Sequence, residues 1–233
     1  MRIKLKNLLF EGGESAGSLE LLSTDIEEAR KFAKKKGFNL DKELPNFNDN
    51  YKLAQKKIKI GRTKRKNMPV IDDKDVKKFQ KRLEQGTLDI YKPFAKQTVA
   101  EDPFPTGLSG LDAKNFITNG LKDGSKKDDI VAVKIKKISV KKLKPIQKQI
   151  YYDKSMGATI QSGISRTTNF LENISFFIIS KDNFIIDGHH RFLSALLVDP
   201  DMKINALSID LPIKKLLPLS LSYGDAIGNK RNA

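Results

Sequence analysis

The stretch with the densest chemistry in the sequence is Asp187-Gly188-His189-His190-Arg191. It holds the only two histidines of the chain, placed between a carboxylate and a guanidinium. An imidazole can donate hydrogen bonds or transfer a proton near neutral pH, and arginine offers a planar fork of donors that suits phosphate. This combination predicts phosphate binding, acid–base chemistry, or both.

The neighbouring residues indicate how these groups are positioned. The apolar run 184–186 predicts a strand, Gly188 permits a sharp turn, and the spacing of Phe192, Ala195 and Leu196 predicts a helix. The first N–H groups of a helix lack partners within the helix and lie at the positive end of its dipole, so they favour an anion. A strand, a glycine turn and a helix start therefore predict an anion site.

We assign predicted roles on this basis. Asp187 and His189 are the predicted catalytic pair, and Gly188, His190 and Arg191 are predicted to hold phosphate or nucleotide. Asp187 could also bind a divalent ion such as Mg²⁺ that bridges phosphates. Two alternatives stay open: a turn that merely caps the helix, and a zinc site, which would need further ligands from carboxylates alone.

Two stretches resemble the ParB/sulfiredoxin-like superfamily. Residues 184–196 are similar to its turn, in the form found in ParB-like nuclease-domain proteins and related free serine kinases, and residues 138–150 are similar to its opening strand and loop. The resemblance implies a small α+β domain whose Gly-His-Arg turn holds nucleotide phosphates, with ATP, ADP or CTP as candidate ligands. It also implies that Gln147 and Gln149, in the loop after Pro145, contact the nucleotide.

The sequence departs from the family pattern at several points, and these departures reduce the number of family activities that we expect. Sulfiredoxin chemistry needs a cysteine, and the chain has none. The turn of partition ParB proteins is of the Gly-Glu-Arg-Arg type, and the stretch after it here is too short for their helix-turn-helix reader, so a segregation clamp is not expected. The free serine kinases use a carboxylate where this loop carries Gln147 and Gln149, which puts kinase chemistry in doubt.

Three functions follow. The first is a nuclease or nucleotide hydrolase acting on phosphoester or phosphoanhydride bonds. The second is a small-molecule kinase using ATP or ADP, with Asp153 or Glu172 as its base. The third is a non-catalytic DNA-binding or virion-associated module, because the lysine-rich composition resembles that of phage proteins.

The charge of the chain favours a polyanionic partner. Lysine and arginine number 44 against 28 acidic residues, a net charge of +16. The densest basic segment is 56–66, and residues 134–148 form a second one. A lysine-rich, A+T-rich genome would also explain the net charge, and a solvated strand and turn would also explain the segment 56–66. The residues predicted to bind nucleic acid are Arg62, Lys64, Arg65 and Lys66.

The expected organisation is α+β. Residues 1–91 are expected to form a basic region with two helices, 25–36 and 73–85, and residues 92–128 a loop-rich connector with a short helix near 111–120. A small mixed sheet with flanking helices is expected over 129–222, followed by a mobile tail at 223–233. Its strands are expected at 130–135, 175–180, 183–187 and 204–210, the middle two forming a hairpin.

Composition also bears on location. No apolar run is long enough to span a bilayer, and the first residues do not resemble a secretory signal. The absence of cysteine suits a reducing compartment. We expect a cytoplasmic protein without a membrane partner, in a host cytoplasm or a virion if it is phage-encoded. The oligomeric state is left open.

Overall fold

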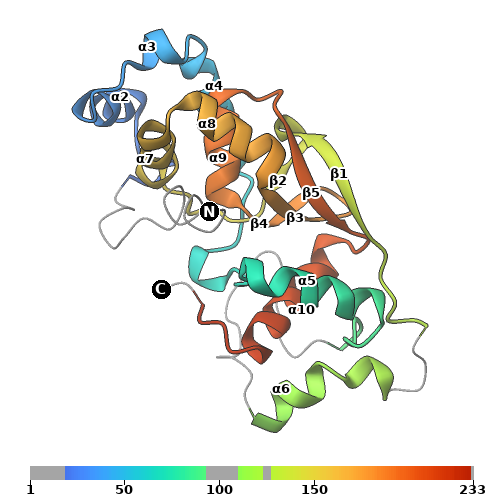
Figure 1. The fold of residues 1–233 in the computed structure, drawn as a ribbon. Helices are drawn as coiled ribbons and strands as arrows, with labels where there is room; N and C mark the ends of the chain where they lie inside the picture. Colours follow the sequence, from blue (N-terminus) through green and yellow to red (C-terminus); the bar gives the residue numbers. More distant parts are fainter. Residues whose placement is uncertain (1–18, 93–109, 123–126, 232–233) are drawn as a thin grey trace. The chain divides into compact units, whose positions relative to one another are not determined.

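The computed structural model describes residues 19–92, 110–122 and 127–231. The fold is α+β, as the sequence predicts, with helices flanking a five-stranded mixed sheet of order β1-β5-β3-β4-β2 (Figure 1). The strands are β1 (Val133–Ser139), β2 (Lys144–Pro145), β3 (Phe176–Ser180), β4 (Phe184–Asp187) and β5 (Lys203–Ile209).

The predicted hairpin is confirmed. Strands β3 and β4 pair antiparallel, with Ile178 opposite Asp187 and Ile179 opposite Ile185. Asn183 closes the turn between them at φ 66°, a left-handed conformation that asparagine tolerates better than most residues. The hairpin therefore delivers Asp187 to the end of β4, directly before Gly188.

The chain folds into two compact units, each assembled from segments that are distant in the sequence. Among the described residues, unit 1 comprises 19–61, 137–177 and 188–205, and unit 2 comprises 62–92, 110–122, 127–136, 178–187 and 206–231. The predicted boundaries at 91, 128 and 222 divide the chain by order along the sequence, and they stay a prediction.

Unit 1 contains more helix than the sequence predicts between residues 38 and 59. Besides α2 (Ile26–Lys35), which matches the prediction, it holds α3 (Leu40–Glu43) and α4 (Phe47–Ile58). Helix α4 buries an apolar stripe at helical spacing that many polar neighbours obscure. Its members are Phe47, Tyr51, Ala54 and Ile58.

An aromatic cluster anchors these N-terminal helices to the rest of unit 1. The ring of Tyr152 lies 5.8 Å from that of Tyr51 and 6.3 Å from that of Phe47, with edge-to-face geometry. Its hydroxyl donates to the Ala29 carbonyl at 3.1 Å. Such aromatic pairs contribute about 0.5–1.5 kcal/mol each beyond the area they bury. Tyr152 thereby fixes the start of the helix α7 (Tyr152–Ser162).

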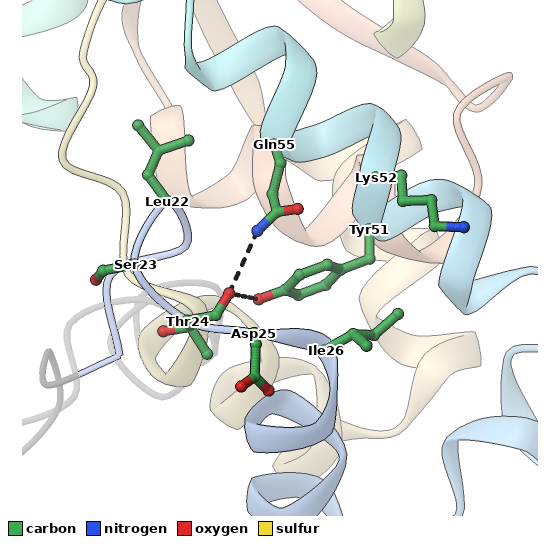
Figure 2. A pocket seen from close by; sticks show the side chains of 8 residues that line it. All are labelled: Leu22, Ser23, Thr24, Asp25, Ile26, Tyr51, Lys52 and Gln55. Carbon is green, nitrogen blue, oxygen red and sulfur yellow. Dashed lines mark hydrogen bonds between the residues drawn. The ribbon is translucent and has the colours of Figure 1, made fainter.

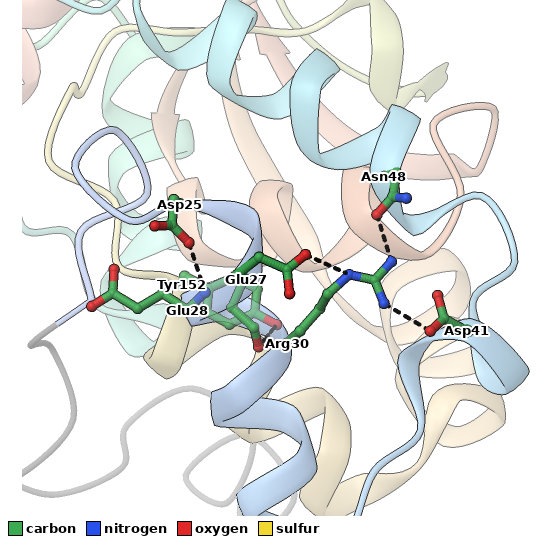
Figure 3. A network of polar contacts seen from close by, with 8 residues as sticks. Asp25, Glu27, Glu28, Arg30, Asp41, Asn48 and Tyr152 are labelled. Carbon is green, nitrogen blue, oxygen red and sulfur yellow. Dashed lines mark hydrogen bonds and ion pairs between the residues drawn. The ribbon is translucent and has the colours of Figure 1, made fainter.

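A polar network joins the helices α2, α3 and α4 on their exposed side (Figure 3). Arg30 donates to Asp41 at 2.7 Å and to Asn48 at 2.8 Å, and lies 3.7 Å from Glu27. The Arg30 guanidinium lowers the pKa of the Asp41 carboxyl through that hydrogen bond. Because the partners are solvent-exposed, the network adds little to stability and serves mainly to align the helices.

The remaining helices of unit 1 lie between β2 and β3 and directly after β4 in the chain. They are α7, α8 (Ile164–Asn169), a π-helix at Phe170–Ile174 and α9 (His189–Val198). Helix α9 is buried on nearly every side and packs against α4 and α7. Asn50 of α4 donates to the Leu197 carbonyl at 3.0 Å, and Ser194 of α9 to the Ser155 carbonyl at 3.0 Å.

Unit 2 holds the predicted helix α5 (Asp73–Glu84), the short α6 (Gly110–Phe116) and α10 (Ile213–Ala226). Pro212 directly precedes α10, and Pro218 lies within it. Proline at a helix start costs nothing, and the buried apolar side of α10 outweighs the penalty of the internal proline.

Part of the predicted mobile tail, residues 223–233, is held in place by polar contacts. Asn229 donates its side-chain amide to the Val70 carbonyl at 3.0 Å, and Arg231 forms an ion pair with the buried Asp225. These polar contacts have no signature in hydrophobic periodicity, which is why the sequence missed them. Residues 232–233, most of the connector and residues 1–18 lie outside the described residues. In the part that is described, no helix combines the length and apolarity that crossing a membrane requires.

Candidate functional site

Gly188 forms the turn from which the candidate site is built. It is buried and left-handed, at φ 105° and ψ 21°. A Cβ atom at this position would lie 2.7 Å from the ring of Phe177 and 3.3 Å from the guanidinium of Arg191. Both conformation and space therefore require glycine here. The turn directs the chain straight into α9.

The first turn of α9 has no capping side chain, as is also true of α4, α7 and α8, whereas two other helices of unit 1 are capped. Asp25 caps α2, and Asn39 caps α3, each accepting from a backbone N–H. No side chain caps the start of α9, and its first turn carries no acidic residue. The positive end of this helix dipole thus lies beside histidine and arginine side chains rather than a carboxylate on the helix itself.

His189 is buried, with 5% of its surface exposed. Its Nε2 accepts hydrogen bonds from the backbone N–H groups of Ile146 at 3.3 Å and Gln147 at 3.2 Å. An atom that accepts two N–H groups carries a lone pair, so the ring is neutral with its proton on Nδ1. Burial, and secondarily the charge of Arg191, lowers the pKa of His189 to about 3. His189 thus ties α9 to the loop after β2.

His190 contacts the same loop further along. Its ring stacks on Tyr151 with 6.1 Å between centroids and 8° between planes. Its Nε2 accepts the Tyr151 backbone N–H at 3.4 Å. Tyr151 is itself held in a bridge with Glu20, and both rings of the stack are half-buried. The two consecutive histidines therefore hold opposite ends of the loop 146–151.

The predicted nucleotide contacts Gln147 and Gln149 both lie in this loop. Gln147 is buried, and its side-chain amide donates to the Gln149 carbonyl, while Gln149 is half-buried. Gly61 packs against the outer side of the loop, since a Cβ there would lie 2.7 Å from the Gln147 carbonyl oxygen. The structure thus brings both glutamines close to the α9 turn and uses Gln147 to shape the loop.

Arg191 is buried, with 6% of its surface exposed. Its Nη1 donates to the Ser175 hydroxyl at 3.1 Å, and its guanidinium carbon lies 5.4 Å from the centroid of the Phe177 ring. A buried guanidinium over an aromatic ring is held rigidly and is less well solvated than at a surface. Ser175 and Phe177 contact Arg191, and the sequence did not indicate either contact.

Asp187 is the half-buried last residue of β4 and precedes the turn in the chain. Within the described ranges no three histidine, aspartate or glutamate side chains gather into a metal-holding group. One carboxylate fits a Mg²⁺ ion only where phosphates and water complete its ligands. The proposed metal role of Asp187 therefore requires a phosphate-bearing ligand.

The predicted nucleic-acid residues follow Gly61 in an irregular stretch and a short 3₁₀ helix, Arg65–Asn67. The side chains of Arg62, Lys64 and Lys66 are exposed, and Arg65 is half-buried. Exposure makes them available to a polyanion without requiring one.

Two surface cavities were found elsewhere in unit 1. One of about 340 Å³ lies between the start of α2 and α4 (Figure 2), where Tyr51 and Gln55 both donate to the Thr24 carbonyl. The other, of about 460 Å³, lies beside Arg30 and Asp41. Neither is lined by residues of the α9 turn. The first is lined by Leu22, Ser23, Thr24, Asp25, Ile26, Tyr51, Lys52 and Gln55.

Comparison with known proteins finds no matching family model, no matching curated protein and no matching solved structure. The likeness to the ParB/sulfiredoxin-like superfamily remains a resemblance carried by the two stretches of sequence named above.

Proposed function

We propose that this protein binds the phosphates of a nucleotide or nucleic acid at the first turn of α9 and hydrolyses a phosphoester or phosphoanhydride bond there. The observation that carries the proposal is the uncapped helix start beside a buried guanidinium, Arg191. Backbone N–H groups at a helix start and a fixed arginine fork are complementary to phosphate oxygens. Gly188 supplies the left-handed turn that leads the chain into this helix start.

In this proposal the two histidines have different tasks. His189 positions the loop 146–151, because its Nε2 is engaged by two backbone donors. The half-buried His190 and Asp187 are then the groups that can exchange a proton with water or a leaving oxygen. This refines the predicted catalytic pair of Asp187 and His189: Asp187 keeps its role and His189 acts through the loop. ATP, ADP or CTP, with Mg²⁺ on Asp187, are the ligands to test first.

One observation supports phosphate transfer to a small molecule as a second candidate. Asp153 is buried in the first turn of α7, two residues after Tyr151, which stacks on His190. A carboxylate so close to the loop could act as the base that Gln147 and Gln149 cannot provide. Glu172, the other residue considered from the sequence, lies in the π-helix, where its carbonyl accepts from Asn205.

A thermal-shift screen of nucleotides, with and without Mg²⁺, followed by product analysis, tests the proposal. We expect stabilisation by at least one nucleotide and release of phosphate or a nucleotide fragment, which Asp187→Asn abolishes without abolishing binding. Transfer to free serine that Asp153→Asn abolishes would favour the second candidate. No stabilisation by any nucleotide, with the protein folded, would contradict both.

A further inference from the structure

Two lysine-rich segments that are more than eighty residues apart in the sequence run side by side in unit 1. Lys57, in the last turn of α4, donates from its Nζ to the carbonyls of Lys141 at 2.5 Å and Leu143 at 3.2 Å. Four residues later, Gly61 packs against the Gln147 backbone. Residues 57–61 therefore run alongside residues 141–147, and helix α4 packs on β2.

The pairing concentrates positive charge along one line. Lys59, Lys142 and Lys144 are exposed along the paired segments. Lys57 is partly buried and lies near enough to Lys144 that the second charge adds to burial in lowering the pKa of Lys57. We name the line formed by Lys57, Lys59, Lys142 and Lys144 the lysine seam.

We propose that the lysine seam binds the phosphate backbone of a nucleic acid. Cations arranged along a line match a polymer that carries a negative charge at regular short intervals, whereas a single nucleotide would engage only one or two of them. Lys57 holds the two segments together through backbone carbonyls, so the backbones that carry the exposed lysines stay side by side. The lysine seam is a different set of residues from the predicted nucleic-acid-binding residues within 62–66, which come directly after Gly61 in the sequence.

The seam leads toward the candidate site. It ends where Gly61 meets Gln147, whose backbone N–H donates to His189 in the first turn of α9. A strand bound along the seam would thus present a phosphate to that turn, which makes a polynucleotide the substrate class. This last link rests on the proposed function; binding along the seam does not.

The test is binding of a fluorescein-labelled DNA duplex, measured by anisotropy, to a variant carrying Lys59→Gln, Lys142→Gln and Lys144→Gln. The control carries Lys31→Gln, Lys35→Gln and Lys36→Gln on α2, an identical charge change at exposed sites of the same unit. We expect the seam variant to bind about 10–100-fold more weakly, and the slope of log affinity against log salt to fall by about 2–3, since each phosphate contact contributes about 0.9. The control should retain nearly the full affinity and slope.

Equal losses in the two variants, or no loss in either, would overturn the seam. So would a seam variant that loses binding to phosphatidylserine vesicles while its DNA binding stays intact, because the surface would then serve a membrane. Product analysis separates the two proposals: if the unaltered protein binds DNA through the seam but hydrolyses neither DNA nor any nucleotide, with or without Mg²⁺, the proposed hydrolysis at α9 falls and the seam stands.

Discussion

The Nε2 atom of His189 lies 3.2 Å from the backbone nitrogen of Gln147, and this contact joins the two stretches of sequence that resemble one superfamily. The first stretch supplies the loop after β2 and the second supplies the turn before α9. A buried imidazole that accepts backbone donors must stay neutral, so the contact also makes the loop sensitive to protonation.

This neutral state predicts a specific dependence of stability on pH. The pKa of His189 falls from 6.5 to about 3 on folding, so below pH 6.5 the unfolded chain binds a proton that the folded protein refuses. The contribution of neutral His189 to the free energy of unfolding is therefore fully present above pH 6.5 and is lost as the pH falls toward 3. We expect the free energy of unfolding to decrease by up to about 1.4 kcal/mol per pH unit, measured by urea denaturation between pH 7 and 5.

The matched control is His189→Gln, which places an amide oxygen near the position of Nε2 and does not titrate. This variant should flatten the dependence of the free energy of unfolding on pH between pH 7 and 5, a range in which few carboxylates change charge. His190→Gln keeps His189 and should therefore leave the dependence in place. An unchanged slope in His189→Gln would show that another group causes the effect.

Gly188 should be far less replaceable than other left-handed glycines. Gly188→Ala combines a positive φ with a close approach to Phe177, and we expect a loss of about 2–4 kcal/mol in the free energy of unfolding. Gly37, at φ 73°, has no heavy atom within 4 Å of an added Cβ, so Gly37→Ala should cost only about 1–2 kcal/mol. Chemical denaturation of both variants measures the difference. Equal losses would mean that the Phe177 contact relaxes without cost.

Much of the local structure near the site could be predicted from the sequence. Strand β4, the glycine turn and helix α9 all appear where the apolar spacing placed them, because each buries a regular pattern. Helix α4 shows the opposite case. Its stripe from Phe47 to Ile58 is regular, but it is interrupted by a buried asparagine, Asn50, whose partner is a carbonyl of α9.

The environment of the site could not be predicted in the same way. That Ser175 and Phe177 hold Arg191, or that Tyr151 stacks on His190, depends on contacts between residues many positions apart. Single-sequence patterns carry no information about such pairs. The neutral state of His189 follows only from knowing which backbone groups it meets. For the same reason the sequence marked both histidines as available for chemistry.

Arg191 should contribute measurably to the binding of phosphate. We expect Arg191→Ala to weaken nucleotide binding by about 1.5–3 kcal/mol, the range for hydrogen bonds to charged groups, and Arg191→Lys to recover part of it by restoring charge without the planar fork. Isothermal titration calorimetry with ADP measures both. Because Arg191 is buried, circular dichroism must first show that each variant is folded. Unchanged affinity in folded Arg191→Ala would refute its role.

Phosphate binding at the first turn of α9 can be observed residue by residue by nuclear magnetic resonance. Backbone amide resonances of ¹⁵N-labelled protein are followed during titration with ADP and, separately, with adenosine, which lacks phosphate. We expect ADP to shift the amides of Gly188, His189, His190 and Arg191, and adenosine to leave them in place. If adenosine shifts the same amides as ADP does, or if ADP shifts only amides elsewhere, phosphate is not held at this turn.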